Sequence, residues 1–176
     1  MKLHPELRFT KYEQPRIKGL YDKLKFENVR LVSRVSQIIR VLNDNGIIPL
    51  VLRSASMKHL YPSFQRTEEN MEILLNEHDF EKALQIIKQM QIKFEILTDD
   101  ILKIFASNVG SEFLVIRKNL FSDICSRKNL ERLVFKRAQP KDIFGVKTYL
   151  PSLVDLSFIT LVDLIMYLRH PVYQTM

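Results

Sequence analysis

The residues with the clearest capacity for chemistry lie between positions 47 and 75. An apolar run over 47–52 ends at the small-residue turn Arg53-Ser54-Ala55-Ser56, and Asn70 and Glu72 follow in a stretch of alternating character. Backbone amides at a helix start can bind phosphate, and a carboxylate on a neighbouring strand can bind a divalent cation. This stretch therefore contains candidate groups for binding an anion and a divalent cation.

The bulk composition is that of a globular protein with one domain. The chain has 176 residues, 46% of them hydrophobic and 27% charged, and it has 4 glycines and 7 prolines. A single cysteine, Cys125, excludes an internal disulfide framework and favours a reducing compartment. The most hydrophobic stretch, 153–168, contains two aspartates and is shorter than a membrane span, so we expect a buried helix there. We therefore expect a cytoplasmic protein without a membrane partner.

The net charge of +7 is unevenly distributed. Residues 1–62 carry 12 Lys and Arg against 5 Asp and Glu, whereas residues 63–81 carry one Arg against six acids. Residues 117–141 carry eight basic residues against two acids. An acidic patch between basic flanks suits a metal-and-phosphate site or an anionic partner, although solvated helix faces give the same pattern.

Apolar periodicity predicts alternating helices and short strands. Residues 1–20 are polar and contain Pro5 and Pro15, so we expect an N-terminal arm or a short helical lead-in before a domain over 21–176. The first long helix should end at Gly46, which can adopt the left-handed cap, and Asp79 should cap the helix after Glu72. Helices are expected over 21–42, 54–61, 79–90, 126–137 and 158–168, and strands over 47–52, 70–75, 92–98, 101–106, 112–118 and 146–150. This is the pattern of an α+β or α/β domain with a mixed sheet flanked by helices.

These residues resemble a known family. The nucleotidyltransferase-like proteins of the polymerase-beta superfamily, in particular a bacterial group of uncharacterised nucleotidyltransferases, typically read Leu-Lys-Gly-small-small, Tyr-Pro, Arg, Asp-Ile-Asp-Leu-Leu-Val and later Val-Glu-Leu-His. This sequence is similar over roughly 25–170, and the corresponding segments are Leu52-Arg53-Ser54-Ala55-Ser56, Tyr61-Pro62, Arg66, Asn70-Met71-Glu72-Ile73-Leu74-Leu75 and Leu114-Val115-Ile116-Arg117.

The departures from the family pattern fall on the metal ligands. The resemblance implies that the first two aspartates and the later glutamate would hold divalent metal, and here those positions are Asn70, Glu72 and Val115. Mg²⁺ gives up its waters only to concentrated negative charge, and two metals about 4 Å apart need several carboxylates. Glu68 is the neighbouring acid that could share a strand face with Glu72, whereas Glu69 has the wrong parity.

The phosphate-binding turn is altered as well. Arg53 keeps the positive charge of the family lysine, but Ser54 adds a side chain where the family has glycine. By resemblance, a nucleotide or another polyanion would contact this turn and the nearby cations. The candidate binding residues are Arg53, Ser54, Ser56, Lys58 and Arg66.

Three functions follow as hypotheses. The first is a catalytically inactive nucleotidyltransferase-like protein, a pseudoenzyme that acts as a binding or regulatory module for a nucleotide, another polyanion or a protein partner. The second is an active enzyme that uses Glu72, Mg²⁺ and a nucleoside triphosphate (NTP) to transfer a nucleoside monophosphate to a small molecule, a protein or RNA. The third is a nucleic-acid-binding protein that uses the basic segment 117–141.

Overall fold

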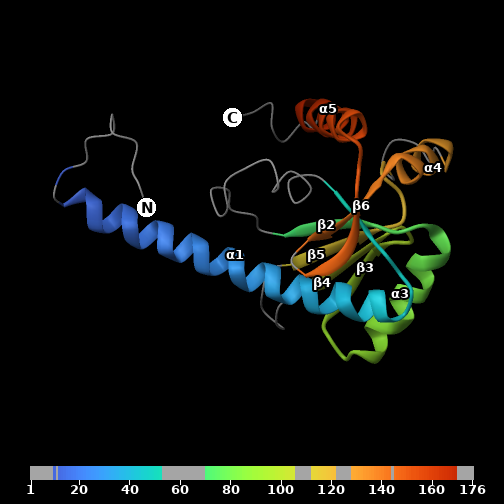
Figure 1. Cartoon of the computed structure of the whole chain (residues 1–176), viewed down its shortest axis with the longest axis horizontal. Helices are drawn as coiled ribbons and strands as arrows, with labels where there is room; N and C mark the ends of the chain where they lie inside the picture. The colour runs from blue at the N-terminus through green and yellow to red at the C-terminus, as the bar shows by residue number, and fades with distance from the viewer. Residues whose placement is uncertain are drawn as a thin grey trace.

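The computed structural model describes residues 10, 12–52, 70–105, 112–121, 128–143 and 145–169, and the structural statements below concern these residues. Within them, helices pack on both faces of one mixed sheet of seven strands (Figure 1). The α+β class predicted from the sequence is therefore confirmed. None of the described helices is both long and apolar enough to cross a membrane.

The longest element is α1, Glu13–Asp44, a helix of 32 residues. At 1.5 Å per residue it is about 48 Å long, and its N-terminal half extends beyond the sheet (Figure 1). It starts earlier than the predicted position 21 because Pro15 lies in the first turn, where the missing N–H costs no helical hydrogen bond. Gly46 ends the segment with φ +79°, as predicted.

The start of α1 is fixed by a reciprocal pair of hydrogen bonds. The Thr10 backbone N–H donates to Glu13 Oε2 at 2.8 Å, and the Glu13 N–H donates to Thr10 Oγ1 at 3.3 Å. These are the two bonds of a capping box, which satisfy backbone donors that a helix start leaves without partners.

The other end of α1 is attached to a distant strand by one amide side chain. Asn43 Nδ2 donates to the Ile47 carbonyl at 3.0 Å and to the Lys147 carbonyl at 3.1 Å. Asn43 Oδ1 accepts from the Lys147 N–H at 3.0 Å. The last turn of α1 is thereby held against a strand that follows about a hundred residues later in the chain.

The strand order in the sheet is β3-β4-β5-β2-β1-β7-β6. The pairs β2–β5 and β1–β7 are parallel, and the other neighbours are antiparallel. The strands are β1 (Leu50–Val51), β2 (Met71–Leu74), β3 (Phe94–Thr98), β4 (Ile101–Phe105), β5 (Glu112–Arg117), β6 (Gln139–Ile143) and β7 (Val146–Leu150).

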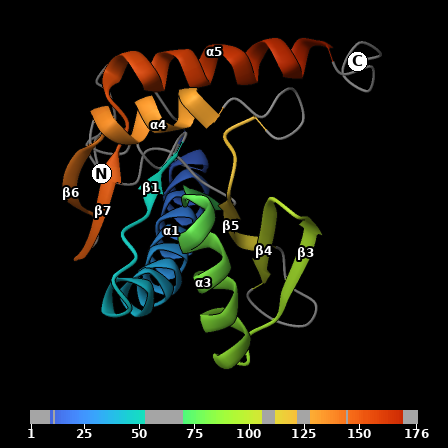
Figure 2. The same cartoon turned by 90° about the vertical axis from the view of Figure 1, so that its right-hand side faces the viewer.

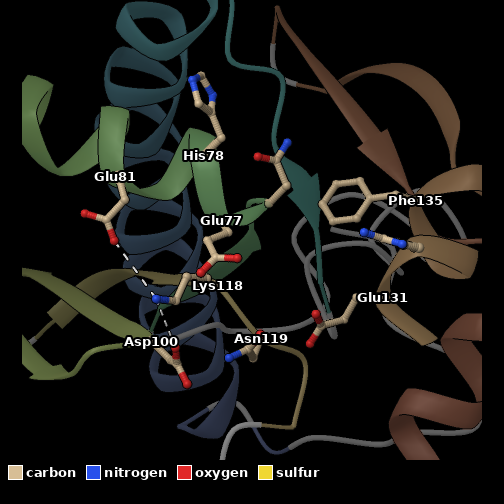
Figure 3. Close-up of a pocket in the computed structure, with 10 residues that line it drawn as sticks. Glu77, His78, Glu81, Asp100, Lys118, Asn119, Glu131 and Phe135 are labelled. Carbon is tan, nitrogen blue, oxygen red and sulfur yellow. Dashed lines mark ion pairs between the residues drawn. The ribbon is translucent and has the colours of Figure 1, made fainter. Parts of the chain in front are cut away.

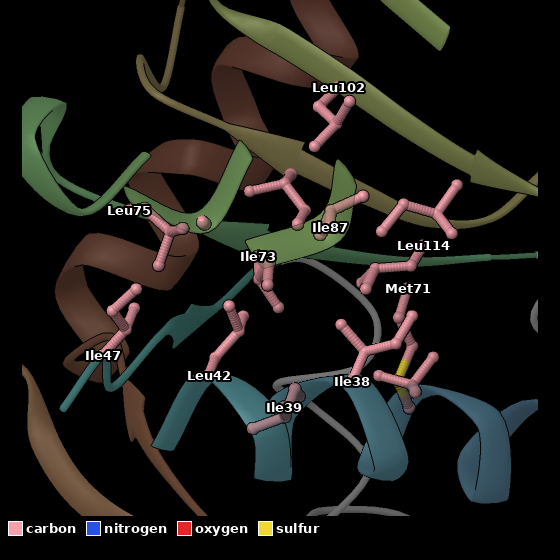
Figure 4. Close-up of a cluster of buried hydrophobic side chains, with 14 of the residues drawn as sticks. Ile38, Ile39, Leu42, Ile47, Met71, Ile73, Leu75, Ile87, Leu102 and Leu114 are labelled. Carbon is pink, nitrogen blue, oxygen red and sulfur yellow. The ribbon is translucent and has the colours of Figure 1, made fainter. Parts of the chain in front are cut away.

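Two hydrophobic cores cover the two faces of the sheet. Alternation along β2 sends Met71 and Ile73 into the larger core, where they meet α1 and α3 (Glu77–Gln89) (Figure 4). Leu74 points the other way, into a smaller core with α4 (Lys128–Arg137) and α5 (Leu153–Arg169). Figure 2 shows α4 and α5 together on one side of the sheet and α1 and α3 on the other.

Most predicted strands and helices are present, with two local differences. The strand β6 was not predicted, because Pro140 and three exposed polar neighbours hide its pattern. Asp79 does not cap α3, contrary to the prediction. The N-cap is Asn76, whose Oδ1 accepts from the Asp79 N–H at 2.9 Å. The predicted helix over 54–61 and Cys125 lie outside the described residues.

The prediction that 153–168 forms a buried helix is wrong in part. Asp155, Leu156 and Ile159 of α5 are buried, but the opposite side of the helix is exposed. Periodicity cannot locate a buried face in a helix that is apolar on all sides. The apolar side chains of α5 that are at least 40% exposed are Leu153, Val154, Phe158, Leu161, Leu164 and Ile165.

Candidate functional site

The parallel pair β2–β5 brings two of the sequence-selected positions together. Glu72 lies directly opposite Val115 in the ladder. Both side chains are on the sheet face covered by α4 and α5, because Leu114 and Ile116 point into the larger core on the other face. Asn70 precedes β2 by one residue and is half-buried. The three positions that would carry metal ligands in the family therefore offer one carboxylate, one amide and one valine.

The carboxylate of Glu72 is held by a cation from the same strand pair. Arg117 Nη2 lies 3.4 Å from Glu72 Oε1, and the side chains are 15% and 9% exposed, respectively. Arg117 is two residues beyond Val115 on β5, so its side chain emerges on the same face. The Arg117 Nε is buried and donates no hydrogen bond. The one acid at the predicted metal position is thus part of a buried ion pair.

The described residues contain no group of three His, Cys, Asp or Glu side chains that could hold a metal ion. The candidate phosphate-binding residues Arg53, Ser54, Ser56, Lys58 and Arg66 lie outside the described residues, as does Glu68. Their arrangement around Glu72 therefore remains a prediction from the sequence.

Three of the described cations of segment 117–141 are engaged with acids of the same chain. Arg117 is paired with Glu72, and Lys118 lies 3.4 Å from Asp100. Arg137 forms a bidentate pair with Asp155, although its side chain is 48% exposed. The other described cations with exposed side chains are Arg132, Lys136 and Lys141.

A hollow lies at the carboxyl-terminal ends of β2 and β5. It is an open cleft of about 940 Å³ between the start of α3 and α4, next to the points where both parallel strands end (Figure 3). Clefts at the carboxyl ends of parallel strands are a common location for ligand sites. The residues that line it are Asn76, Glu77, His78, Glu81, Asp100, Lys118, Asn119, Glu131, Arg132 and Phe135.

Several polar groups of this cleft already make structural contacts. Lys118 lies 3.4 Å from Asp100 and 4.0 Å from Glu81, and its ammonium is also over the Phe80 ring. Glu131 Oε1 accepts from the Leu120 N–H at 2.9 Å. With acids and cations both present and partly paired, the cleft has no clear preference for one ligand charge.

Sequence reasoning missed the cleft because its residues come from separate segments that form no motif. The available signal was topological: two strands that end side by side must place the residues after them, Asn76 and Asn119, at one edge of the sheet. Using that signal requires knowing that β2 and β5 are parallel neighbours, which the sequence pattern does not reveal.

Comparison with known proteins adds no relative. No family model, no curated protein and no solved structure matches this chain.

Proposed function

We propose that this chain is a nucleotidyltransferase-like protein that has lost metal-dependent transfer and acts as a binding module for a nucleotide or another polyanion. The proposal rests on the residues that resemble the family and on the state of the one remaining carboxylate.

The observation that carries the proposal is the ion pair between Glu72 and Arg117 beside Val115. A metal site needs carboxylates whose charge is available to the ion, and Mg²⁺ in particular binds through carboxylates and retained waters. Here the guanidinium occupies the neighbourhood of the carboxylate at 3.4 Å, and the residue opposite is a buried valine. Within the part of the chain that the structure describes, a cation entering this place would meet Arg117 before it met a second acid.

The arrangement of strands is compatible with an ancestral site. Adjacent parallel strands place residue 72 and residue 115 side by side, which is where a shared metal would need two ligands. Such a site would become an ion pair if valine replaced the carboxylate at position 115 and an arginine stood two residues later, at position 117. This supports loss of the reaction with retention of the fold.

The nucleic-acid hypothesis receives less support than it did from the charge count. Arg117, Lys118 and Arg137 are engaged with acids of the same chain. Backbone phosphate binding requires several cations that can meet the strand together. We therefore propose that the polyanion binds at Arg53 and Arg66 rather than at segment 117–141.

The test is binding and turnover by the full chain with ATP and with inorganic triphosphate. Isothermal titration calorimetry should show binding that is the same with Mg²⁺ and with EDTA, because no metal bridges the ligand. A double variant, Arg53→Ala with Arg66→Ala, should weaken binding at least about tenfold, which is the loss of one or two charge-assisted contacts. Arg40→Ala, an exposed arginine on α1, is the matched control and should bind normally.

Turnover is measured with NTPs labelled on the base and on the γ-phosphate, in Mg²⁺ and in Mn²⁺. No labelled product is expected. A labelled product that requires metal and disappears in Glu72→Gln would contradict the loss of catalysis and support the active enzyme. Absence of binding to both ligands would reject the polyanion-binding module.

A further inference from the structure

The side of α5 that faces away from the sheet carries a continuous row of apolar side chains. Ile159 lies on the buried side of the helix, and the exposed apolar side chains lie opposite to it. Residues separated by four, three and four positions stay on one side of an α-helix. The exposed residues with this spacing form the apolar row, which consists of Val154, Phe158, Leu161 and Ile165.

The polar side chains near the apolar row are already satisfied within the helix. Ser157 Oγ donates to the Leu153 carbonyl at 2.8 Å, and Thr160 Oγ1 donates to the Leu156 carbonyl at 2.8 Å. Hydroxyls that bond back to the preceding turn of a helix leave its surface less polar. The outward side of α5 therefore offers a partner apolar contact, and apolar surfaces of this kind mark interaction sites.

The neighbouring helix α4 adds charge of a single sign. Figure 2 shows α4 next to α5 on one side of the sheet, and Arg137 of α4 binds Asp155 in the first turn of α5. Among the side chains of these two helices that the structure describes, the exposed charged ones are Arg132, Lys136 and Arg137. All three are cations, so the apolar row has a basic flank.

We propose that α5 binds an amphipathic helix of another protein, whose apolar face packs on the apolar row and whose acidic residues lie next to the basic flank on α4. Apolar side chains in such a row are the means by which one helix packs along another. Complementary charge beside the apolar contact gives the partner its orientation and excludes partners of the wrong sign.

The same features disfavour two other occupants. A second copy of the chain would bring the same three cations into the interface, where like charges repel. A helix that lies in a membrane surface carries Lys and Arg on its own polar side. In α5 the opposite side is not polar surface, because Leu156 and Ile159 are buried there and Ile159 belongs to the smaller core.

The first test is selection from a displayed library of helical peptides. Apolar residues are fixed at the a and d positions of each heptad, and the flanking positions vary among Glu, Lys and Ser. The full chain is the target, and Leu161→Glu is the competitor that removes peptides bound to other surfaces. Leu161 is 54% exposed, so the variant should unfold at the same urea concentration as the parent.

The selected peptides should contain more Glu than Lys at the flanking positions. The proposal would be overturned if no peptide preferred the parent chain to Leu161→Glu, or if the selected peptides were enriched in Lys.

A charge exchange then tests the basic flank. Fluorescence anisotropy gives the dissociation constant of a selected Glu peptide, and Lys136→Glu should raise it about fivefold. The same variant should bind more tightly a peptide with Lys at those positions. The matched control is Lys88→Glu, an exposed lysine on α3, which should bind both peptides as the parent does. Equal effects of the two variants would show that net charge selects the peptide, and would overturn the role of α4.

The other occupants are tested with the full chain alone. Sedimentation with vesicles of phosphatidylcholine and phosphatidylserine measures lipid binding, and analytical ultracentrifugation measures self-association. Neither experiment should show an association that Leu161→Glu removes. Vesicle binding or a dimer that this variant abolishes would assign the apolar row to that occupant and overturn the proposal.

Discussion

Two ion pairs lie on the same side of the sheet, and they are built differently: Arg117 and Glu72 are both largely buried, whereas Arg137 is 48% exposed and only its partner Asp155 is buried. Arg137 binds Asp155 with two nitrogens, and Asp155 is 3% exposed. Asp155 Oδ2 also accepts from Ser152 Oγ, and the Asp155 N–H donates to Ser152 Oγ at 3.2 Å. By contrast, Arg117 reaches Glu72 through one contact at 3.4 Å, and its Nε is buried without a hydrogen bond.

The difference is one of hydrogen-bond geometry. Ser152 and Asp155 share two hydrogen bonds at the start of α5, and Asp155 also joins that helix to α4. The contact between Arg117 and Glu72 is long, and burying two charges costs desolvation energy that only good hydrogen-bond geometry offsets. We therefore expect the pair Arg117–Glu72 to stabilise the fold less than the pair Arg137–Asp155.

The largest effect should come from Arg137→Met, which leaves the Asp155 carboxylate buried without its cation. We expect a loss of about 3–5 kcal/mol in the free energy of unfolding, measured by urea denaturation. Adding Asp155→Leu should recover only part of the loss, because the carboxylate also accepts from Ser152. The matched control is Lys136→Met, the exposed neighbour on α4, which should change stability by less than about 0.5 kcal/mol.

An intermediate effect is expected from Arg117→Met, about 1–3 kcal/mol by the same measurement, because the contact that it removes is long and single. The double variant with Glu72→Met should be within about 1 kcal/mol of the parent or more stable, since an apolar pair fills the space without desolvating charges. If the double variant were as unstable as Asp155→Leu with Arg137→Met, the two ion pairs would be equivalent and the contrast between them would be wrong.

The smallest effect concerns the exposed capping box at the start of α1. Hydrogen bonds from the Thr10 backbone and side chain lower the pKa of Glu13 below its usual value of 4.5. The stabilisation of the first turn is therefore present above pH 4.5 and is lost as the pH falls through the lower pKa of the folded state. Amide exchange at Glu13, followed by NMR from pH 6 to pH 2, roughly the range over which a carboxylate titrates, should show this loss.

The glutamine variant Glu13→Gln is the control, because its side chain keeps the shape and has no carboxylate to titrate. Exchange at this turn should then be independent of pH after correction for the intrinsic rate. An unchanged pH dependence would show that another group controls the first turn.

The sequence was sufficient to predict those elements that pack one side against a hydrophobic core. The helix α3 and the strands β2, β4, β5 and β7 were predicted close to their observed positions, because each has one side in a core and a regular period. The edge strand β6 was missed, since an exposed edge with Pro140 imposes no apolar period. The outer side of α5 was assigned to the interior because nothing in its composition distinguishes the two sides.

The strand that carries Glu72 was predictable from the sequence, and the contacts of Glu72 were not. The spacing of Asn70 and Glu72 identified the strand, and similarity to a family identified Val115 as a partner position. The ion pair with Arg117 depends on the parallel register of β2 and β5, whose residues are about 45 positions apart. Such a pairing is set by the sheet as a whole, and no local pattern specifies it.

The position of β1 has a consequence for synthesis of the chain on the ribosome. This two-residue strand is flanked by β2 on one side and β7 on the other, and Asn43 bonds to Lys147 in β7. Everything from α1 to β5 can therefore be outside the ribosome while one side of β1 still lacks its neighbour. Completion of the sheet waits for residue 150 to leave the exit tunnel, and a chain interrupted before that point would present the open side of β1 to chaperones and proteases.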